Sequence, residues 1–535
     1  MTAHMITPAA SDDNRAAHIA LIDEVRMLEQ RVRDSSNRSR AKFEKRGQLV
    51  PRDRLKLLLD RGAPFVELST LCGYKMHDDD GDKNIAGGGV IAGIGFVSGV
   101  RVMVGASDSG IRGGAATPMG VDKVLRAQDI AFENRLPYVQ IIESAGANLF
   151  RQADMFVKGG KTFANLARHS AAGLPVVSLV SGSSTAGGAY QSGLSDYIVV
   201  VRNRSRIFLA GPPLLRAATG ESASEEELGG AEMHYHVSGT AEYMAENDAD
   251  GIRQLREIVG RLGWNREFVL SPLAPAVPPT GDPDAILDVV PSDYRKPYDV
   301  RAVIAHLVDG SAFLDFKAGY GPDMVTVHAR IGGHEVGILS NNGPIDANCA
   351  AKAAQFIQLC CQSNTPLIFL QNTTGFLVGK DAEAAGIVKH GSKMIQAVTN
   401  ATVPKITINI GASFGAGNYG MCGRGFGPRF LFAWPNSRIS VMGGEQAAKT
   451  MAIVMEDGAR AQGAEPDQAA LDAMSAKVIA AYDAEGRALY ATARLWDDGL
   501  IDPRDTRKVL IFCLDTCREA AARSLKPNMF GVARL

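Results

Sequence analysis

The sequence predicts an α/β protein built from two copies of one domain. Strand-length apolar runs alternate with helical patterns in both halves, which is typical of parallel sheets covered by helices. Landmark residues also recur 229 positions apart, and one spacing over a long stretch indicates a duplicated domain rather than a short solenoid repeat. The pairs are Lys123 and Lys352, Pro137 and Pro366, Gly146 and Gly375, Pro175 and Pro404, Gly188 and Gly417, and Tyr190 and Tyr419. Beyond them the spacing drifts, to 233 for Gly110 and Gly343 and to 232 for Gly211 and Gly443.

Length and composition limit the possible functions. A chain of 535 residues is too long for one ordinary core, and 46% apolar with 21% charged residues is typical of a globular protein. The net charge of −1 gives no support for nucleic-acid or membrane-surface partners, and the apolar runs are only strand-sized. The seven cysteines are scattered without a CxxC pair, so we expect reduced core thiols and no metal. The N-terminus lacks a signal or transit pattern, which predicts a cytoplasmic protein.

The predicted elements define four segments. Residues 1–60 form an N-terminal helical segment, because apolar residues from Ile19 to Val32 recur at helical spacing. Residues 61–272 form the first domain, residues 273–284 a proline-rich linker, and residues 285–535 the second domain. In the first domain we expect a strand hairpin at 91–106, helices at 121–134 and 162–170, a strand at 138–142 and a loop at 143–148. In the second we expect strands at 326–331, 335–340 and 367–371, and helices at 348–363 and near 392–399.

A glycine-rich turn follows a buried strand in each half. Leu174 to Tyr190 reads as an apolar strand, a turn of small residues and a helix that opens at two glycines; Val403 to Tyr419 repeats this design. Without side-chain bulk, backbone N–H groups at the start of such a helix can point directly at a ligand oxygen. Two known motifs overlap the second turn but do not explain it.

The first of these motifs is G-x-G-x-x-G, which Gly415 to Gly420 matches. The first copy does not keep this glycine spacing, and no acidic residue ends a second strand where a ribose contact needs one. The second is G-x-S-x-G around Ser413; that hydrolase fold needs a histidine later in the chain, whereas the last histidine is His390. Ser413 is therefore predicted to be a turn hydroxyl with local hydrogen bonds.

With no nucleophile or metal cluster, the chemistry left to these turns is electrostatic. Paired backbone N–H groups can stabilise an oxyanion, and such a site suits the enolate of a thioester. Two turns suggest two enolate-like species, or one substrate oxyanion and a second carbonyl. Alternatively, the glycines only allow close packing of helix on strand. Repetition at a fixed spacing favours the oxyanion function.

Long motifs in both halves resemble the carboxyltransferase (beta) subunits of biotin-dependent acyl-CoA carboxylases. The resemblance runs from about Arg40 to the C-terminus. It rests on STAGGAY and GASFGAGNYGMCGRGFGPRF in the two turns, and on ESAGANLFRQAD (143–154), IFLAGPPLLRAATGE (207–221), NNGPID (341–346), AWPNSRISVMGGEQAA (433–448) and ATARLWDDGLIDPRDTR (491–507). It implies tandem ClpP/crotonase-like domains, each a β-β-α superhelix.

The resemblance also implies roles for the turn residues. Gly187 and Gly188 would hold the thioester oxygen of an acyl-CoA enolate, and Ala416 and Gly417, with Gly415 and Phe414 beside them, would hold biotin through its ureido oxygen. Biotin freed of its carboxylate would be the base, so no side-chain base is needed. The further residues implied for binding the CoA thioester are Ala145, Gly146, Gly159 and Ala186. CoA would lie on the first domain and biotin on the second domain of a neighbouring subunit.

The implied partner is an alpha subunit that carries the biotin carboxylase and biotin carrier functions, since this chain lacks a Met-Lys-Met biotinylation signature and an ATP-grasp region. The implied assembly is a β6 core of an α6β6 complex. Residues 147–154 resemble the 3-methylcrotonyl/geranyl branch, whose members carboxylate the γ-carbon of a 3-methyl-2-enoyl-CoA. Gly159 stands where the methylcrotonyl enzymes carry a bulky phenylalanine. Space left by a missing ring favours geranyl-CoA, at about 0.8 kcal/mol for each buried CH2.

Several alternatives stay open. The loop near Gly159 could have moved, which would leave 3-methylcrotonyl-CoA, and propionyl- or acetyl-CoA is a further possibility. A biotin-independent hydratase or decarboxylase would need an acidic base, for which Glu143 is the one candidate. Lys123 and Arg126 could approach the CoA phosphates, but solvated positions on a helix face explain them better. The recurrence of Lys123 as Lys352 indicates a shared structural role instead.

Overall fold

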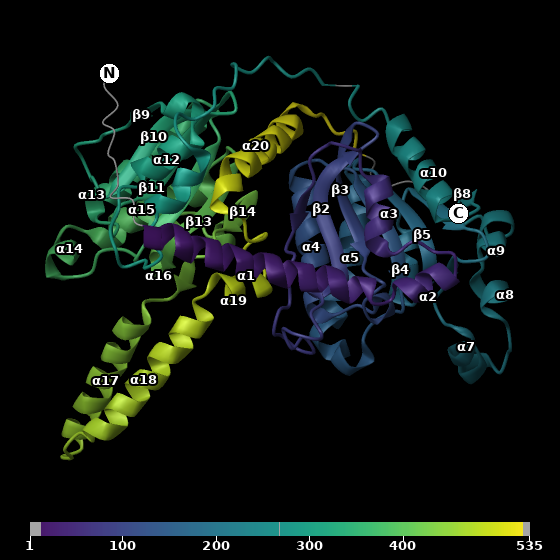
Figure 1. Cartoon of the computed structure of the whole chain (residues 1–535), viewed down its shortest axis with the longest axis horizontal. Coiled ribbons are helices and arrows are strands. Elements are labelled where there is room, and N and C mark those ends of the chain that lie inside the picture. Colours follow the sequence, from purple (N-terminus) through teal and green to yellow (C-terminus); the bar gives the residue numbers. More distant parts are fainter. Residues whose placement is uncertain (1–11, 267, 528–535) are drawn as a thin grey trace. The chain divides into compact units, whose positions relative to one another are not determined.

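The computed structural model describes residues 12–266 and 268–527, which fall into two compact units. The first unit consists of residues 27–271, 493–495 and 516–527. The second unit consists of residues 12–26, 272–492 and 496–515. Both are shown in Figure 1, the first unit mainly in blue and the second mainly in green. Three helices contribute residues to both units: α1 (Asp12–Asn37), α20 (Thr506–Ala522) and, by its last residue, α19 (Ala488–Ala493).

The first unit is built on an eight-stranded mixed sheet. Its first two strand pairs are antiparallel, and all later pairs are parallel. In sheet order the strands are β1 (Val66–Leu68), β2 (Val90–Val97), β3 (Val100–Ser107), β4 (Tyr138–Ser144), β5 (Val176–Thr185), β6 (Tyr197–Val201) and β8 (Tyr243–Ala245), with β7 (Arg206–Phe208) paired to the end of β5.

Helices cover both faces of this sheet. The helices of the unit, apart from the parts of α1, α19 and α20, are α2 (Arg40–Lys45), α3 (Pro51–Leu58), α4 (Pro118–Glu133), α5 (Gln152–Ala171), α6 (Gly187–Gly193), α7 (Pro212–Thr219), α8 (Glu225–Gly229), α9 (Ala231–His236) and α10 (Asp248–Arg261). On one face, α3 and α10 bury a continuous apolar core with alternate residues of the strands, among them Val139 and Ile141. The residues between these, Tyr138, Gln140 and Ile142, point to the opposite face.

The second unit repeats this plan. Its strands are β9 (Phe313–Asp315), β10 (Met324–Ile331), β11 (His334–Asn341), β12 (Leu367–Thr373), β13 (Lys405–Phe414) and β14 (Phe430–Ala433), with β15 (Arg438–Ser440) paired to the end of β13. Its helices are α11 (Ile286–Val289), α12 (Arg301–Leu307), α13 (Ala347–Gln362), α14 (Lys380–Ala384), α15 (Ile387–Asn400), α16 (Gly415–Gly420), α17 (Gly444–Ala461), α18 (Gln468–Glu485) and the start of α19 (Ala488–Ala493).

The repeat predicted from the sequence is present in the backbone. Strands β4 and β12, strands β5 and β13, and helices α4 and α13 begin 229 residues apart. Even irregularities recur: the register shifts after Ile142 on β4 and after Gln371 on β12, and the isolated bridge between Ala116 and Ala147 has its counterpart between Ile345 and Phe376. The two copies therefore share local geometry as well as element order.

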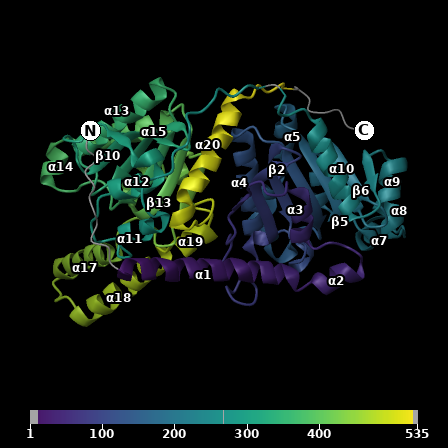
Figure 2. The same ribbon diagram turned by 45° about the horizontal axis from the view of Figure 1, so that its top comes forward.

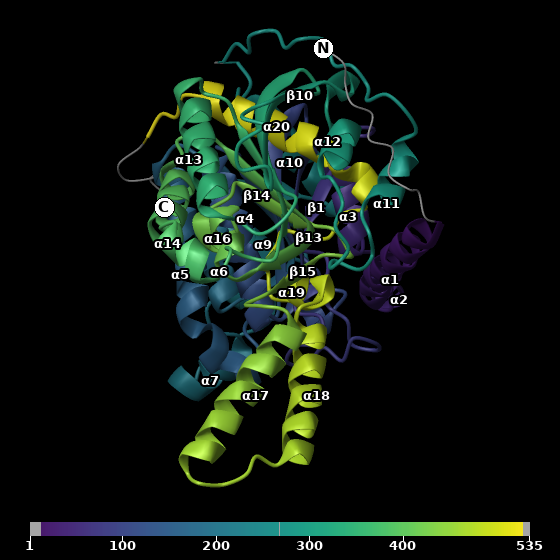
Figure 3. The same ribbon diagram turned by 90° about the vertical axis from the view of Figure 1, so that its left-hand side faces the viewer.

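Some elements differ from the sequence-based expectation. Helix α5 begins at Gln152 rather than near Thr162, and Glu143 and Ser144 belong to β4 instead of a loop. After the matched glycines Gly211 and Gly443, the copies diverge. The first has the eight-residue α7; the second has a hairpin of two 18-residue helices, α17 and α18, which lie side by side in Figure 3. The first eleven residues of the predicted N-terminal helical segment, and residues 528–535, lie outside the described part of the chain.

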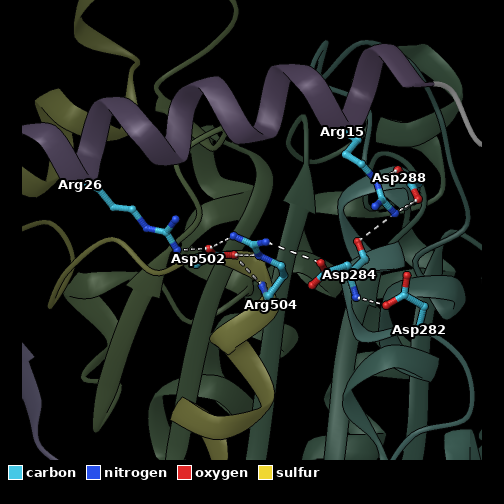
Figure 4. A network of polar contacts seen from close by, with 7 residues as sticks. All are labelled: Arg15, Arg26, Asp282, Asp284, Asp288, Asp502 and Arg504. Atoms are coloured by element: carbon cyan, nitrogen blue, oxygen red, sulfur yellow. Dashed lines mark hydrogen bonds and ion pairs between the residues drawn. The ribbon is translucent and has the colours of Figure 1, made fainter.

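Helix α1 is a single unbroken helix of 26 residues (Figure 2). Within the second unit its first half is held by ion pairs, drawn in Figure 4. Arg15 binds both carboxylate oxygens of Asp288, at 2.8 and 2.6 Å, and Arg26 donates to Asp502 at 2.8 Å. Asp502 also accepts from Arg504, so one carboxylate joins the helix to the segment before α20. These charges fix the position of the helix start over the second unit.

Candidate functional site

The turn between β5 and α6 presents two backbone N–H groups that have no protein acceptor. Gly187 and Gly188 are the first residues of α6, so their amides precede the hydrogen-bond ladder of the helix. Within the described residues, neither amide donates to another group. Ala186 before them has φ 52° and ψ −119°, a conformation that costs an L-residue roughly 1–3 kcal/mol. The fold thus holds a strained residue at the point where the two amides emerge.

The turn between β13 and α16 repeats this arrangement. Gly415, with φ 54°, corresponds to Ala186, while Ala416 and Gly417 correspond to Gly187 and Gly188. The amides of Ala416 and Gly417 also lack an acceptor within the described residues. A side chain at Gly417 would lie 2.8 Å from the Cα atom of Gly375, so only glycine fits there. The sequence-based prediction of two matched turns thus agrees with the backbone geometry.

A hydroxyl on the neighbouring strand stabilises the loop that lies against each turn. In the first unit Ser144 Oγ accepts from the amide of Gly146 at 3.1 Å; in the second, Thr373 Oγ1 accepts from the amide of Gly375 at 3.1 Å. Both strands pair with the last residues of β5 or β13 at this point. We did not predict these two hydroxyls from the sequence, although their spacing of 229 residues could have indicated them.

A cavity of about 510 Å³ opens beside the first turn. It lies on the sheet face that α4 and α5 cover, and its walls combine small residues with a few large ones. From the turn come Ala186, Gly187 and Gly188; from the sheet Gly105, Tyr138, Gln140, Ile142 and Ser144; and from α5 Met155, Phe156, Gly159, Gly160, Thr162 and Phe163. The free amides thus open onto a mostly apolar chamber, as a thioester with a hydrocarbon chain requires.

Of the predicted substrate residues, Gly146, Gly159 and Ala186 line this cavity, whereas Ala145 is exposed and lies outside its lining. A Cβ atom at Gly159 or at Gly160 would meet no other atom within 4 Å. The two glycines therefore leave real space in the chamber and are not positions where packing demands glycine. Phe156 and Val157 continue the α5 wall and are largely exposed, at 79% and 82%.

The suggestion that Lys123 approaches CoA phosphates is wrong. Lys123 is 2% exposed, and its ammonium group donates to the carbonyl oxygens of Gly87 (3.2 Å) and Val90 (2.7 Å). Lys352 is equally buried and donates to the carbonyl oxygen of Gly321 at 3.4 Å. Burial lowers the pKa of both lysines. The recurrence therefore reflects a shared structural role, in which α4 and α13 are each tied to backbone carbonyls of neighbouring segments. Arg126 on α4 is half-buried.

Three further side chains considered from the sequence have structural partners. Glu143 is 8% exposed and accepts from Arg54 (2.6 Å) and Ser109 (2.7 Å), so it is not positioned as a free base. Ser413 is fully buried; its hydroxyl bonds Gln371 and accepts from Asn418 at 2.7 Å, as expected of a structural hydroxyl. Phe414 is 5% exposed and packs its ring edge-on to Tyr294, 5.3 Å away.

The cysteines agree with the expectation of core thiols. All seven are free, and six are buried; Cys361 is half-buried. Within the described part of the chain, no helix combines the length and the apolar character that crossing a membrane requires.

Comparison with known proteins fits this geometry. Residues 42–530 match the family model of the carboxyl transferase domain. The chain is 48% identical to a probable biotin-dependent acyl-coenzyme A carboxylase beta2 subunit of Mycobacterium tuberculosis, over 92% of this chain and 91% of that protein. It is 46% identical to the biotin-dependent 3-methylcrotonyl-coenzyme A carboxylase beta1 subunit of the same organism, over 99% of each.

Among solved structures, the beta subunit of P. aeruginosa geranyl-CoA carboxylase is 55% identical, with a TM-score of 0.93 and full coverage of both chains. The resemblance inferred from the motifs is confirmed, and so is the tandem crotonase-like fold. The chain belongs to the carboxyl transferase family and is a carboxyltransferase (beta) subunit of the biotin-dependent acyl-CoA carboxylases.

Proposed function

We propose that this subunit transfers a carboxyl group from carboxybiotin to the γ-carbon of a 3-methyl-2-enoyl-CoA, and that its substrate is geranyl-CoA. The observation that carries the proposal is the cavity beside Gly187 and Gly188, which Gly159 and Gly160 leave wide on the α5 side. A methylcrotonyl group would leave much of such a chamber unfilled. A geranyl group would fill more of it and gain about 0.8 kcal/mol for each additional CH2 removed from water.

In this proposal the first turn stabilises the enolate of the acyl-CoA. The amides of Gly187 and Gly188 donate to the thioester oxygen as negative charge develops on it, an effect commonly worth a hundredfold or more in rate. The apolar walls keep water away from the extended enolate and align its γ-carbon. A hydratase of the same fold would need a free acidic base, and the engagement of Glu143 by Arg54 and Ser109 argues against that alternative.

The second turn fits the ureido group of biotin. The amides of Ala416 and Gly417 are free, Gly415 and Ala416 are at least partly exposed, and the turn is uncharged, which suits a neutral carbonyl oxygen. When bound, carboxybiotin would supply the activated carboxyl group and, once that group has left, the base for the substrate proton. The role of the chain is then to donate two hydrogen bonds to the ureido oxygen and to orient the ring.

The partner, assembly and location follow from family resemblance. We propose that biotin reaches this chain on an alpha subunit with biotin carboxylase and carrier functions, that the chain forms a β6 core of an α6β6 complex, and that this complex is cytoplasmic. The acyl-CoA and biotin turns that meet would come from neighbouring subunits.

The direct test is a substrate panel with the purified complex of this chain and its alpha subunit. ATP-dependent incorporation of bicarbonate is measured with geranyl-, 3-methylcrotonyl-, propionyl- and acetyl-CoA. We expect geranyl-CoA to have the highest kcat/KM, and Gly159→Phe to block geranyl-CoA while sparing 3-methylcrotonyl-CoA. Equal or better use of 3-methylcrotonyl-CoA by the unaltered chain would instead support the second candidate, which the 46% identity to a 3-methylcrotonyl-coenzyme A carboxylase subunit favours.

A further inference from the structure

The deep end of the acyl cavity is polar, which an enzyme for plain hydrocarbon chains does not need. Tyr138 and Gln140 line the cavity from β4, where they are 2% and 6% exposed. The Tyr138 hydroxyl lies next to Gly105: a Cβ atom added to that glycine would be 2.8 Å from the hydroxyl oxygen. Within the described residues this hydroxyl has no hydrogen-bond partner, and burial raises its pKa, so it remains a protonated donor.

Gln140 offers the complementary group. Its amide nitrogen donates to Ser178 Oγ at 3.3 Å, which fixes the orientation of the side chain. No group of the described residues donates to its carbonyl oxygen, which is therefore available as an acceptor. An unused donor and an unused acceptor thus face one buried space, and buried polar groups without partners are costly unless a ligand or water engages them.

The second unit shows that the fold does not require this polar floor. By the shared spacing and strand pairing, Leu367 and Phe369 replace Tyr138 and Gln140, and Leu339 replaces Gly105. All three are fully buried in a solid apolar core beneath α13 and α15. The same sheet face is therefore filled in one copy and hollowed, with a polar floor, in the other.

The helices above the floor differ in the same way. In the first unit Gln128, Asn165 and His169 are buried in a hydrogen-bonded cluster: Asn165 donates to Gln128 at 3.1 Å, and Gln128 donates to the carbonyl oxygen of Thr162 at 3.1 Å. The corresponding residues of the second unit are Ile357, Met394 and Val398, all fully buried. The polar character thus extends through the layer that encloses the end of the cavity.

The distance along β4 places this floor at the far end of a prenyl chain. Ser144 lies beside the first turn, and the four strand steps from Ser144 to Gln140 span roughly 13 Å. A fully extended chain gains about 3.5 Å for every three bonds, so the eight-carbon main chain of a geranyl group spans about 8 Å. The remaining distance is about that of one carbon–oxygen bond plus a hydrogen bond.

We propose that Tyr138 and Gln140 bind an oxygen at the far end of the acyl chain, so that the enzyme accepts prenyl-type acyl-CoA substrates carrying a terminal hydroxyl group. The Tyr138 hydroxyl donates to this oxygen, and the Gln140 carbonyl accepts its proton in a hydrogen bond. The inference rests on the proposed function, because it takes the acyl chain of a CoA thioester to occupy this cavity. It adds a recognition element for the remote end of that chain.

The test compares geranyl-CoA with its 8-hydroxy derivative in the complete complex. In an apolar pocket a buried hydroxyl typically costs tenfold or more in kcat/KM. We expect instead that kcat/KM for the hydroxylated substrate, divided by kcat/KM for geranyl-CoA, is close to or above one. Tyr138→Phe and Gln140→Leu should each lower this ratio by about tenfold. Tyr243→Phe, which removes an exposed hydroxyl from β8 outside the cavity, is the matched control and should leave the ratio unchanged.

A ratio below one tenth in the unaltered enzyme would overturn the inference, and so would a ratio that neither variant changes. If Tyr138→Phe does not fold, Gln140→Leu decides alone. If neither thioester is carboxylated, the proposed function fails; the inference is then decided by the ratio of the two dissociation constants, measured by titration calorimetry on the same proteins.

Discussion

The two units share the geometry of the glycine-rich turn but differ in how the sheet face beside it is filled. In both, a parallel strand leads into a short helix whose first amides have no acceptor among the described residues, and a hydroxyl stabilises the loop beside the turn. Behind the first turn the face is hollow; behind the second it is filled by leucine, phenylalanine and methionine side chains. The two copies thus share the pair of free backbone amides but differ in the size of the space beside them. The first copy therefore has space for a chain, while the equivalent space in the second copy is filled.

The largest effect should come from removing one free amide from each turn. Gly187→Pro and Ala416→Pro each delete an N–H near the start of a helix, where proline is tolerated. Each should lower the rate of carboxylation by about a hundredfold or more. The measurement is kcat for carboxylation of geranyl-CoA by the complete complex.

The controls keep the amide and change the side chain. Gly187→Ala and Ala416→Gly should stay within about tenfold of the parent, because the space around Gly187 is limited only by the ring of Phe163. If one proline variant retained full activity, the turn that carries it would not be an oxyanion site.

A buried carboxyl group of the second unit, Asp497, should make stability depend on pH. Burial raises the pKa of Asp497 to about 7, while the amide of Gly499 donates to it at 3.0 Å. The folded state therefore binds a proton more tightly than the unfolded chain, and its stability falls as pH rises from about 4 to about 7. Asp497→Asn should remove this loss and stabilise the protein at pH 8 by about 2–4 kcal/mol, with little effect at pH 4. Urea unfolding at both pH values checks this; equal effects at both would contradict it.

A smaller difference should separate the two buried lysines. Lys123→Met leaves two backbone carbonyls without their donor and should destabilise the first unit by about 1–3 kcal/mol. Lys352→Met removes one long hydrogen bond of 3.4 Å, so its effect should be smaller. Denaturant unfolding of the two variants, compared with the parent, ranks them. A larger loss for Lys352→Met would show that burial, not hydrogen bonding, determines the role of these side chains.

Much of this comparison could be predicted from the sequence, because it depends on local patterns. The spacing of 229 residues, the strand hairpin and the two turns involve only neighbouring residues or direct repetition. The partners of Glu143 could not be predicted, since Arg54 lies 89 positions away and no local pattern joins them. Lys123 was ambiguous for a related reason: a lysine on a helix face can equally well be solvated or tied to a loop.

The polar floor of the cavity also could not be predicted from local sequence patterns. It forms because Gly105 pairs with Gln140 across strands, and because Tyr138 reaches over that glycine. The glutamine within the apolar run from Tyr138 to Ile142 was nevertheless a visible signal, since a buried strand seldom carries an amide without a purpose. The corresponding residue of the second half is the apolar Phe369, and this contrast with Gln140 would have strengthened the signal.

The most direct test of the division between the two units is the binding of geranyl-CoA to two matched variants. Gly159→Phe adds a ring to α5 inside the cavity, and Val388→Phe adds one at the equivalent position of α15 in the second unit, where the side chain is 70% exposed. Titration calorimetry should show geranyl-CoA affinity reduced by at least about thirtyfold in the first variant and unchanged in the second. Equal affinities in both, or a greater loss with Val388→Phe, would contradict the assignment of the acyl chain to the first unit.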